Sequence, residues 1–244
     1  MLTAVNVGSP EEGRLPPEPD IIAPPPAVAA EVARLDAALG QVPVPAKAPG
    51  ANIIIGSRSR ERAEATSLQY NDIVGQPVVQ GMANKDMLAA AQIVFLTVSA
   101  DQVDSAVDSS RGDFAPGLIL VDVTVPVRFQ EGRAEYLEQE EGSNAERIAA
   151  RVPGHVSVVG AFKTLPAHVL SELDTPLQCD MFVCGDSREA REKVMEVARM
   201  IPTLRPLDAG PLRAARTLER MTVLAIHLNR RYKKKSARYS IVGL

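Results

Sequence analysis

A short run of serines and arginines carries the clearest chemical signal in this sequence. The run Gly56-Ser57-Arg58-Ser59-Arg60-Glu61-Arg62 follows a β-branched segment and opens a helix-like stretch. Arginines in the first turns of a helix lie against the positive end of its dipole, which costs free energy unless an anion is bound. Serine hydroxyls and guanidinium groups are also good donors for a phosphate. We therefore predict a phosphate site on Ser57, Arg58 and Arg62.

The expected place of this run in a fold indicates which phosphate it would bind. In a dinucleotide-binding fold the end of the second strand meets the adenosine ribose, where an acid selects NAD and an arginine accommodates the 2′-phosphate of NADP. NADP is therefore the predicted cofactor. The alternative is a solvated helix start, in which Glu61 and Glu64 neutralise the arginines.

A dinucleotide site also needs a glycine-rich turn before the first helix. Thr3–Val7 predicts a first strand, and Gly8 and Gly13 bound the candidate phosphate loop Gly-Ser-Pro-Glu-Glu-Gly. This loop departs from the dinucleotide fingerprint, because Pro10 removes an amide donor and the two glutamates would repel phosphate.

The sequence offers no readable acid–base set for catalysis. His155, His168 and His227 are scattered, and Cys179 and Cys184 form neither a disulfide framework nor a metal-ligand set. An α/β protein without such a set still suits hydride transfer between two cofactors, since the cofactors themselves carry that chemistry.

The elements that must position these residues alternate between strands and helices. Short apolar runs predict strands at 52–56, 92–98, 118–123, 156–160 and 180–185, and helical patterns fall at 59–71, 84–91, 100–110, 144–151 and 187–200. Runs that are apolar on both faces favour a parallel sheet between helix layers. We therefore expect a Rossmann-like α/β fold with helices on both faces, followed by a long amphipathic helix at 212–231 and a basic cluster at 230–235.

Composition divides the chain into three expected parts. Residues 1–50 hold ten of the 19 prolines and no aromatic residue, so they are expected to be an aberrant segment with one helix at 27–39. Residues 51–165 are expected to form the dinucleotide-binding domain, and 166–244 a smaller C-terminal portion. A net charge of −3 gives no basic field for nucleic acid. With no apolar run near 18 residues, no membrane contact and a cytoplasmic location are expected.

Several segments together resemble the coenzyme F420-dependent NADP oxidoreductases. The matching pieces run in family order over about residues 51–231 and include Gly81-Met-Ala-Asn84, Phe95-Leu-Thr-Val98, Ala161-Phe-Lys-Thr-Leu-Pro-Ala167, Val183-Cys-Gly-Asp186 and Leu204-Arg-Pro-Leu-Asp-Ala-Gly-Pro-Leu212. The resemblance implies a Rossmann domain that passes a hydride between NADP(H) and the deazaflavin coenzyme F420.

The resemblance also implies roles for particular residues. Ser57, Arg58 and Arg62 would hold the 2′-phosphate, and the dinucleotide would be lined by Thr97, Val98 and Gln102. Val125 and Ala161 would flank the nicotinamide, and Leu212 would face the deazaflavin ring. A homodimer through the C-terminal helix is a further expectation, with small-molecule cofactors as the other partners.

The chain departs from this family at its N-terminus. The family carries a Gly-Gly-Thr-Gly-type loop about two dozen residues before Gly-Ser-Arg, whereas Gly8 lies 48 residues before Gly56. A frame shift over roughly residues 14–48, a rebuilt loop, or loss of tight cofactor binding would each explain the difference. Two other functions stay open: a non-catalytic or impaired dinucleotide-binding protein of the same descent, and a reductase of small imines like the pyrroline-carboxylate reductases.

Overall fold

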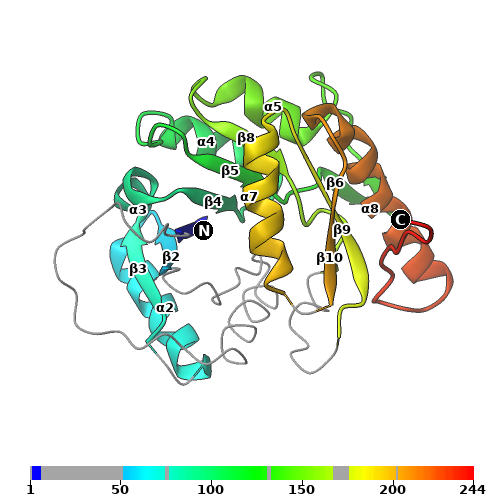
Figure 1. The fold of residues 1–244 in the computed structure, drawn as a ribbon, viewed down its shortest axis with the longest axis horizontal. Coiled ribbons are helices and arrows are strands. Elements are labelled where there is room, and N and C mark those ends of the chain that lie inside the picture. The colour runs from blue at the N-terminus through cyan, green and yellow to red at the C-terminus, as the bar shows by residue number, and fades with distance from the viewer. Residues whose placement is uncertain (1, 7–51, 75–76, 131–132, 167–175, 202) are drawn as a thin grey trace.

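A central sheet with helices on both faces makes up the molecule (Figure 1). The computed structural model describes residues 2–6, 52–74, 77–130, 133–166, 176–201 and 203–244. The helix expected at 27–39, and Gly8 and Gly13, lie outside the described residues.

Eight strands form the main sheet in the order β10-β9-β8-β5-β4-β1-β2-β3. These strands are β1 Leu2–Asn6, β2 Asn52–Ser57, β3 Val79–Ala83, β4 Ile93–Leu96, β5 Ile119–Asp122, β8 Ser157–Gly160, β9 Cys179–Gly185 and β10 Leu204–Asp208. A separate antiparallel hairpin pairs β6 (Val127–Gln130) with β7 (Arg133–Tyr136). The expected boundary at residue 165 falls between β8 and β9, which belong to the same sheet.

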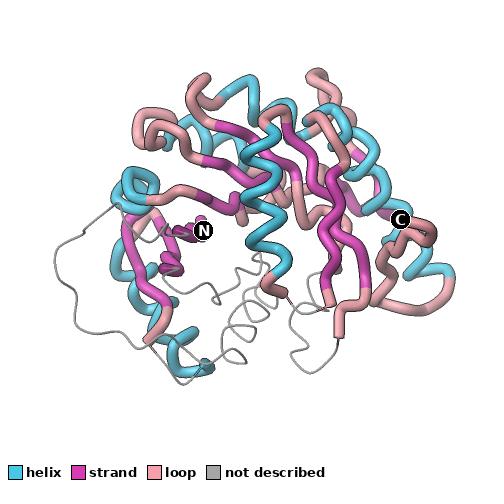
Figure 2. Tube along the Cα trace, viewed as in Figure 1, coloured by secondary structure: helices cyan, strands magenta, loops and turns pink. Residues whose placement is uncertain are grey.

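Helices cover both faces of this sheet (Figure 2). They are α2 Arg60–Val74, α3 Asn84–Ala90, α4 Val103–Ser110, α5 Asn144–Arg151, α7 Arg188–Arg199 and α8 Ala215–Arg231, the last preceded by the 3₁₀ turn η1 Leu212–Ala214. Each helix predicted within the described residues is present, which confirms the expected α/β class.

The sheet separates two hydrophobic cores, because successive strand residues point to opposite faces. On one face Ile53 and Ile55 pack with side chains of α2 and α7, and on the other Ile54 packs with side chains of α3, α4, α5 and α8. β4 and β5 are buried at every position, as their uniformly apolar sequences predict.

Strand direction departs from the all-parallel expectation at two places. β2 and β3, β4 and β5, β5 and β8, and β9 and β10 pair in parallel. β8 and β9 run antiparallel, and β1 runs antiparallel to both of its neighbours, β2 and β4. The sheet is therefore mostly parallel, with a reversed strand at its centre.

The reversal of β1 decides which end of that strand reaches which edge of the sheet. Leu2 pairs with Gly56 and Leu96 at the carboxyl ends of β2 and β4, whereas Asn6 pairs with Asn52 at the amino end of β2. The chain consequently leaves β1 at the edge opposite to the carboxyl ends of its neighbours.

Candidate functional site

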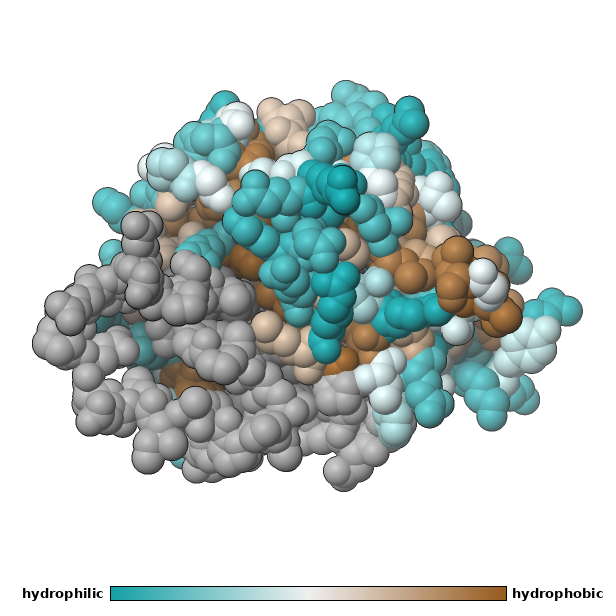
Figure 3. All heavy atoms as spheres, in the orientation of Figure 1, coloured by the Kyte–Doolittle hydropathy of each residue, from teal (hydrophilic) through white to brown (hydrophobic). Residues whose placement is uncertain are grey.

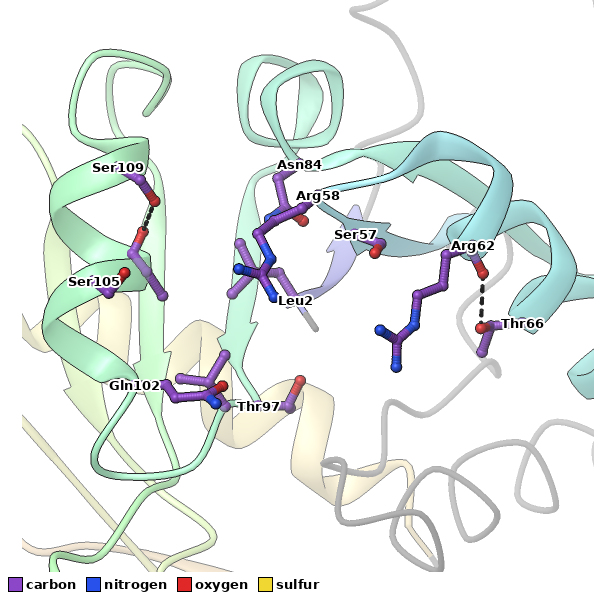
Figure 4. A pocket seen from close by; sticks show the side chains of 12 residues that line it. Leu2, Ser57, Arg58, Arg62, Thr66, Asn84, Thr97, Gln102, Ser105 and Ser109 are labelled. Atoms are coloured by element: carbon purple, nitrogen blue, oxygen red, sulfur yellow. Dashed lines mark hydrogen bonds between the residues drawn. The ribbon is translucent and has the colours of Figure 1, made fainter.

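A cavity of about 600 Å³ opens at the carboxyl ends of β2 and β4 (Figure 4). Its walls come from the start of α2, the start of α3 and one side of α4. It is lined by Leu2, Ser57, Arg58, Arg62, Thr66, Asn84, Thr97, Val98, Gln102, Ser105, Ala106 and Ser109. Ligands of open α/β sheets bind in such a crevice, outside the carboxyl ends of the strands.

The predicted phosphate residues meet on one side of this cavity. Ser57 ends β2 and is nearly buried, while the Arg58 and Arg62 side chains extend from the strand end and the first turn of α2 into the cavity (Figure 4). The structure therefore brings these three residues together, as their spacing in the sequence predicted.

The neighbouring glutamates pair with other groups. Glu64 makes a 2.9 Å ion pair with Arg60, and Glu61 accepts a hydrogen bond from the Ser59 hydroxyl at 2.5 Å. Among the described residues, neither the Arg58 nor the Arg62 guanidinium forms an ion pair. Glu61 and Glu64 therefore make no ion pair with Arg58 or Arg62.

The predicted dinucleotide residues line the opposite wall. Thr97 and Val98 follow β4 directly, and Gln102 lies just before α4. Thr97 is nearly buried and Val98 is half-buried. The structure thus places Thr97, Val98 and Gln102 in the same cavity as the two arginines.

The described part of the cavity lacks a glycine-rich turn. Leu2, the first residue of the reversed β1, occupies the place beside the carboxyl ends of β2 and β4. In a sheet with a parallel first strand, the carboxyl end of that strand would deliver its loop here. Gly8 and Gly13 lie outside the described residues, so their predicted role stays a prediction.

The residues predicted to contact the nicotinamide and deazaflavin rings lie farther along the edge of the sheet at which the cavity opens. Leu96, Asp122 and Gly160 align across β4, β5 and β8, which places Val125 and Ala161 beyond the same strand ends as Thr97. Ala161 is fully buried, Val125 is half-buried, and Leu212 is 4% exposed in η1. None of these three lines the cavity, so the structure leaves them apart from the phosphate residues.

A buried group of charged side chains lies near Val125 and Ala161, where β5 and β8 end. The Lys163 ammonium is 2.6 Å from a carboxylate oxygen of Asp122 and 3.0 Å from one of Glu219, and all three side chains are at most 1% exposed. Sequence reasoning missed this cluster, since its members are far apart in the chain. A signal was present in Asp122, an acid that ends an otherwise apolar strand, and in Lys163, a lysine between buried neighbours.

Two features are absent from the described residues. Within the part of the chain that the structure describes, no cluster of histidine, cysteine or acidic side chains could hold a metal ion. The same ranges contain no helix long and apolar enough to cross a membrane.

The mostly parallel sheet and the arginine-lined cavity at its carboxyl edge define the class of Rossmann-like dinucleotide-binding proteins. A family model described as "NADP oxidoreductase coenzyme F420-dependent" matches residues 39–126. The chain belongs to this family, because two curated members are closely similar over most of their length.

Both curated relatives are named F420-dependent NADP reductase. The one from Methanothermobacter thermautotrophicus is 35% identical over 201 residues, which cover 80% of this chain and 86% of the relative. The one from Methanocaldococcus jannaschii is 33% identical over 198 residues, which cover 79% of this chain and 88% of the relative. Both comparisons bear out the family resemblance seen in the sequence.

The fold is shared with a solved structure as well. A protein of Arthrobacter sp. fb24 that carries a provisional F420-dependent NADP reductase name superimposes with a TM-score of 0.66. The superposition covers 88% of this chain and 95% of the other, at 20% sequence identity. At that identity the likeness concerns the fold, and it agrees with the family membership.

Proposed function

We propose that this protein is an oxidoreductase that transfers a hydride between NADP(H) and coenzyme F420. The observation that carries the proposal is the pair of guanidinium groups, Arg58 and Arg62, that face the cavity without an ion-pair partner among the described residues. The names of the two curated relatives support both cofactors. The cytoplasmic location expected from the sequence belongs to the same proposal.

The residues present fit NADP at the adenosine end. Two cations and the Ser57 hydroxyl can donate charge-assisted hydrogen bonds to a 2′-phosphate, and the start of α2 adds the positive end of its dipole. Arg58 and Arg62 would bind and orient this phosphate, while Thr97, Val98 and Gln102 would line the rest of the dinucleotide.

At the redox end the protein's task is positioning. NADPH supplies two electrons and one hydrogen as a hydride, and the reduced deazaflavin takes up one further proton. Val125 and Ala161 would flank the nicotinamide, and Leu212 would pack against the deazaflavin. Ala161 and Leu212 are buried and Val125 is half-buried, so these apolar groups would exclude water from the transfer.

Titration with NADPH and NADH tests the phosphate end of the proposal. Removing one charge-assisted hydrogen bond costs about 1.5–3 kcal/mol, so R58A or R62A should weaken NADPH binding roughly 10- to 150-fold. NADH binding should change little. Arg60→Ala is the matched control, because Arg60 lies in the same helix turn but pairs with Glu64. Equal weakening of both nucleotides, or an equal effect of R60A, would contradict the proposed 2′-phosphate site.

Turnover tests the hydride transfer itself. The proposal predicts loss of F420 absorbance when NADPH is added to the folded protein. Tight NADPH binding without turnover would instead favour the second candidate, a non-catalytic dinucleotide-binding protein. The reversed β1 and the lack of a glycine-rich turn in the described cavity favour that candidate.

We also propose a homodimer through α8. The outward face of α8 and the residue after it expose apolar and aromatic side chains, namely Leu224, Leu228 and Tyr232. Hydrophobic residues also gather at the right of the molecule, where the C-terminus lies beside α8 (Figure 3). Light scattering at micromolar concentration should give twice the mass of 26.1 kDa, and a monomer would refute this proposal.

A further inference from the structure

The buried cluster around Lys163 connects four elements at the redox end of the sheet edge. Asp122 ends β5, Lys163 follows β8, and Glu219 lies in the second turn of α8. The N-terminus of α5 closes the cluster, because the backbone amides of Asn144 and Ala145 donate to Glu219 at 3.0 and 3.3 Å. The cluster is thus part of the frame that holds the redox end together.

All three donor hydrogens of the Lys163 ammonium have an acceptor. Two acceptors are the carboxylates of Asp122 and Glu219, and the third is the Thr124 carbonyl at 2.6 Å. Burial alone would lower the pKa of Lys163, but the attraction of the two carboxylates outweighs it and the pKa is raised. The lysine is therefore charged.

Every carboxylate oxygen in the cluster accepts a hydrogen bond. One Asp122 oxygen accepts from the Thr124 amide at 2.9 Å and from the Thr124 hydroxyl at 2.6 Å, and the other accepts from Lys163. The Glu219 oxygens accept from Lys163, the two α5 amides and the Tyr136 hydroxyl at 2.7 Å. No oxygen of the two carboxylates is left without a donor.

The cluster therefore buries two negative charges and one positive charge. Two arginines on the helices that close the cluster have their own acidic partners, since Arg147 of α5 lies 3.4 Å from Asp104 and Arg220 of α8 pairs with Glu138. The dipole of the short helix α5 offsets part of the remaining charge but does not cancel it. A net negative charge of up to one unit stays below the surface at this point.

This charge lies beside the place proposed for the nicotinamide. Lys163 is two residues from Ala161, and the carbonyl that it binds belongs to Thr124, the residue before Val125. Both links are at most two residues long, so the cluster would be adjacent to a ring held between Ala161 and Val125. The nicotinamide ring is positively charged when oxidised and neutral when reduced.

We infer that the Asp122–Lys163–Glu219 cluster biases the bound cofactor toward NADP⁺ and so makes bound NADPH a stronger hydride donor. The inference rests on the proposed function. For a separation taken as roughly 8 Å and an effective dielectric between 20 and 80, a unit charge changes the ratio of the NADP⁺ and NADPH dissociation constants roughly 3- to 30-fold. For a two-electron couple this lowers the potential of bound nicotinamide by about 14 to 44 mV.

Two neutralising variants test this inference, with two variants that preserve charge as controls. E219Q and D122N each remove one negative charge, so each should lower the preference for NADP⁺ over NADPH roughly 3- to 30-fold. Tyr136→Phe removes a donor to Glu219, and Glu219→Asp moves the carboxylate; both keep the charge, so the ratio should stay within about twofold of the wild-type value.

Equilibrium titration of both cofactors onto each variant gives the ratio directly, with unfolding curves to establish that each variant is folded. Suppose that the wild-type protein binds NADPH and that at least one neutralising variant is folded. If the ratio of the NADP⁺ and NADPH dissociation constants is then unchanged in that variant, the inference is wrong. The same shift in Y136F as in E219Q also overturns it, because packing rather than charge would then be the cause. A wild-type protein that binds neither cofactor refutes the proposed function and, with it, this inference.

Discussion

The two ends of the sheet edge use charged side chains in opposite ways. At the phosphate end, Arg58 and Arg62 face the cavity without an ion-pair partner among the described residues. At the redox end, Lys163 is fully buried and has three acceptors. Unpaired cations at an open cavity are suited to binding a charged ligand, whereas a buried, fully hydrogen-bonded cluster is suited to holding a fixed geometry.

Removing the lysine should strongly destabilise the protein. Lys163→Met keeps a similar side-chain length but leaves two buried carboxylates without their cation, which typically costs about 3–5 kcal/mol. Urea unfolding measures the loss. The matched control is Lys193→Met, since Lys193 forms an exposed pair with Glu189 one helix turn away and should cost less than about 0.5 kcal/mol. Similar losses in both variants would contradict the buried compensation.

A further buried acid, Asp180, should make stability depend on pH. The Asp180 side chain accepts two hydrogen bonds from Arg205, at 2.6 and 2.8 Å, and the Arg205 guanidinium lowers the pKa of this carboxyl below its usual value. A lowered folded-state pKa gives stability that is present above the unfolded pKa, near 4, and is lost as the pH falls through the folded value.

The variant Asp180→Asn isolates this contribution. At pH 7 it should be less stable than the wild-type protein by roughly 1.5–3 kcal/mol, the usual worth of a hydrogen bond to a charged group. The difference should shrink as the pH is lowered below about 4. Urea unfolding at pH 7, 4 and 3 measures both proteins, and a constant difference across that range would be inconsistent with the lowered pKa.

The residues of the phosphate end could be predicted from the sequence, and those of the buried cluster could not. Ser57, Arg58 and Arg62 lie within six positions of one another, so one strand end and one helix turn suffice to place them together. Lys163 meets Asp122 and Glu219 from 41 and 56 positions away. Their meeting depends on strand order and on the packing of α8, which local periodicity does not contain.

At the scale of elements, Gly81 lets α2 pack closely on β3. A Cβ at Gly81 would lie 2.3 Å from the Glu64 amide nitrogen and 2.4 Å from the Ala63 carbonyl carbon, both backbone atoms of α2. Neither atom can move without the helix. Because α2 also carries Arg62, this contact fixes the position of one residue of the proposed phosphate site.

Gly81→Ala should therefore impair both stability and binding. Overpacking of this kind costs about 1–3 kcal/mol, and a displaced α2 should weaken NADPH binding more than NADH binding. Gly112→Ala is the control, since nothing lies within 4 Å of its added Cβ and its backbone needs no positive φ. Thermal unfolding and nucleotide titration measure the two effects, and a G81A protein indistinguishable from G112A would refute the close packing.

Burial explains which strands the sequence predicted. β4 and β5 are buried at all four positions, so their apolar runs stand out. The unpredicted strands β6, β7 and β10 are partly or largely exposed, β3 contains Gly81, and β10 contains a proline. β3 and β10 are the two edge strands of the sheet, where glycine and proline are tolerated and a continuous apolar run is not required.

At the scale of the whole molecule, the direction of β1 was beyond prediction. A five-residue strand between two others can bury its side chains in either direction. Its sequence therefore does not determine whether it runs parallel or antiparallel to β2 and β4. Direction is set by the connecting chain, and that chain begins at Asn6, opposite the cavity. The direction of β1 therefore decides whether a loop after it starts near the arginine-lined cavity or at the opposite edge of the sheet.

Engineered cysteine pairs can establish the direction of β1. In the reversed strand Leu2 lies opposite Leu96, so L2C/L96C should form a disulfide on mild oxidation, because directly opposed Cβ atoms are about 4.5–5.5 Å apart. L2C/I93C should not, since Ile93 lies three residues away along β4, roughly 10 Å. Burial raises the pKa of Cys179 to about 11 and that of Cys184 to about 12, so the native thiols stay protonated and do not compete.

The crosslink also bears on the phosphate loop. If L2C/L96C closes and NADPH still binds, the pyrophosphate must be held by groups other than a turn directly after β1. If L2C/I93C closes instead, β1 is parallel to β4 and its carboxyl end, two residues before Gly8, reaches the cavity as in the dinucleotide fingerprint. Mass spectrometry of the oxidised proteins distinguishes the two outcomes, and NADPH titration of the closed form then shows whether the direction of this strand matters for binding.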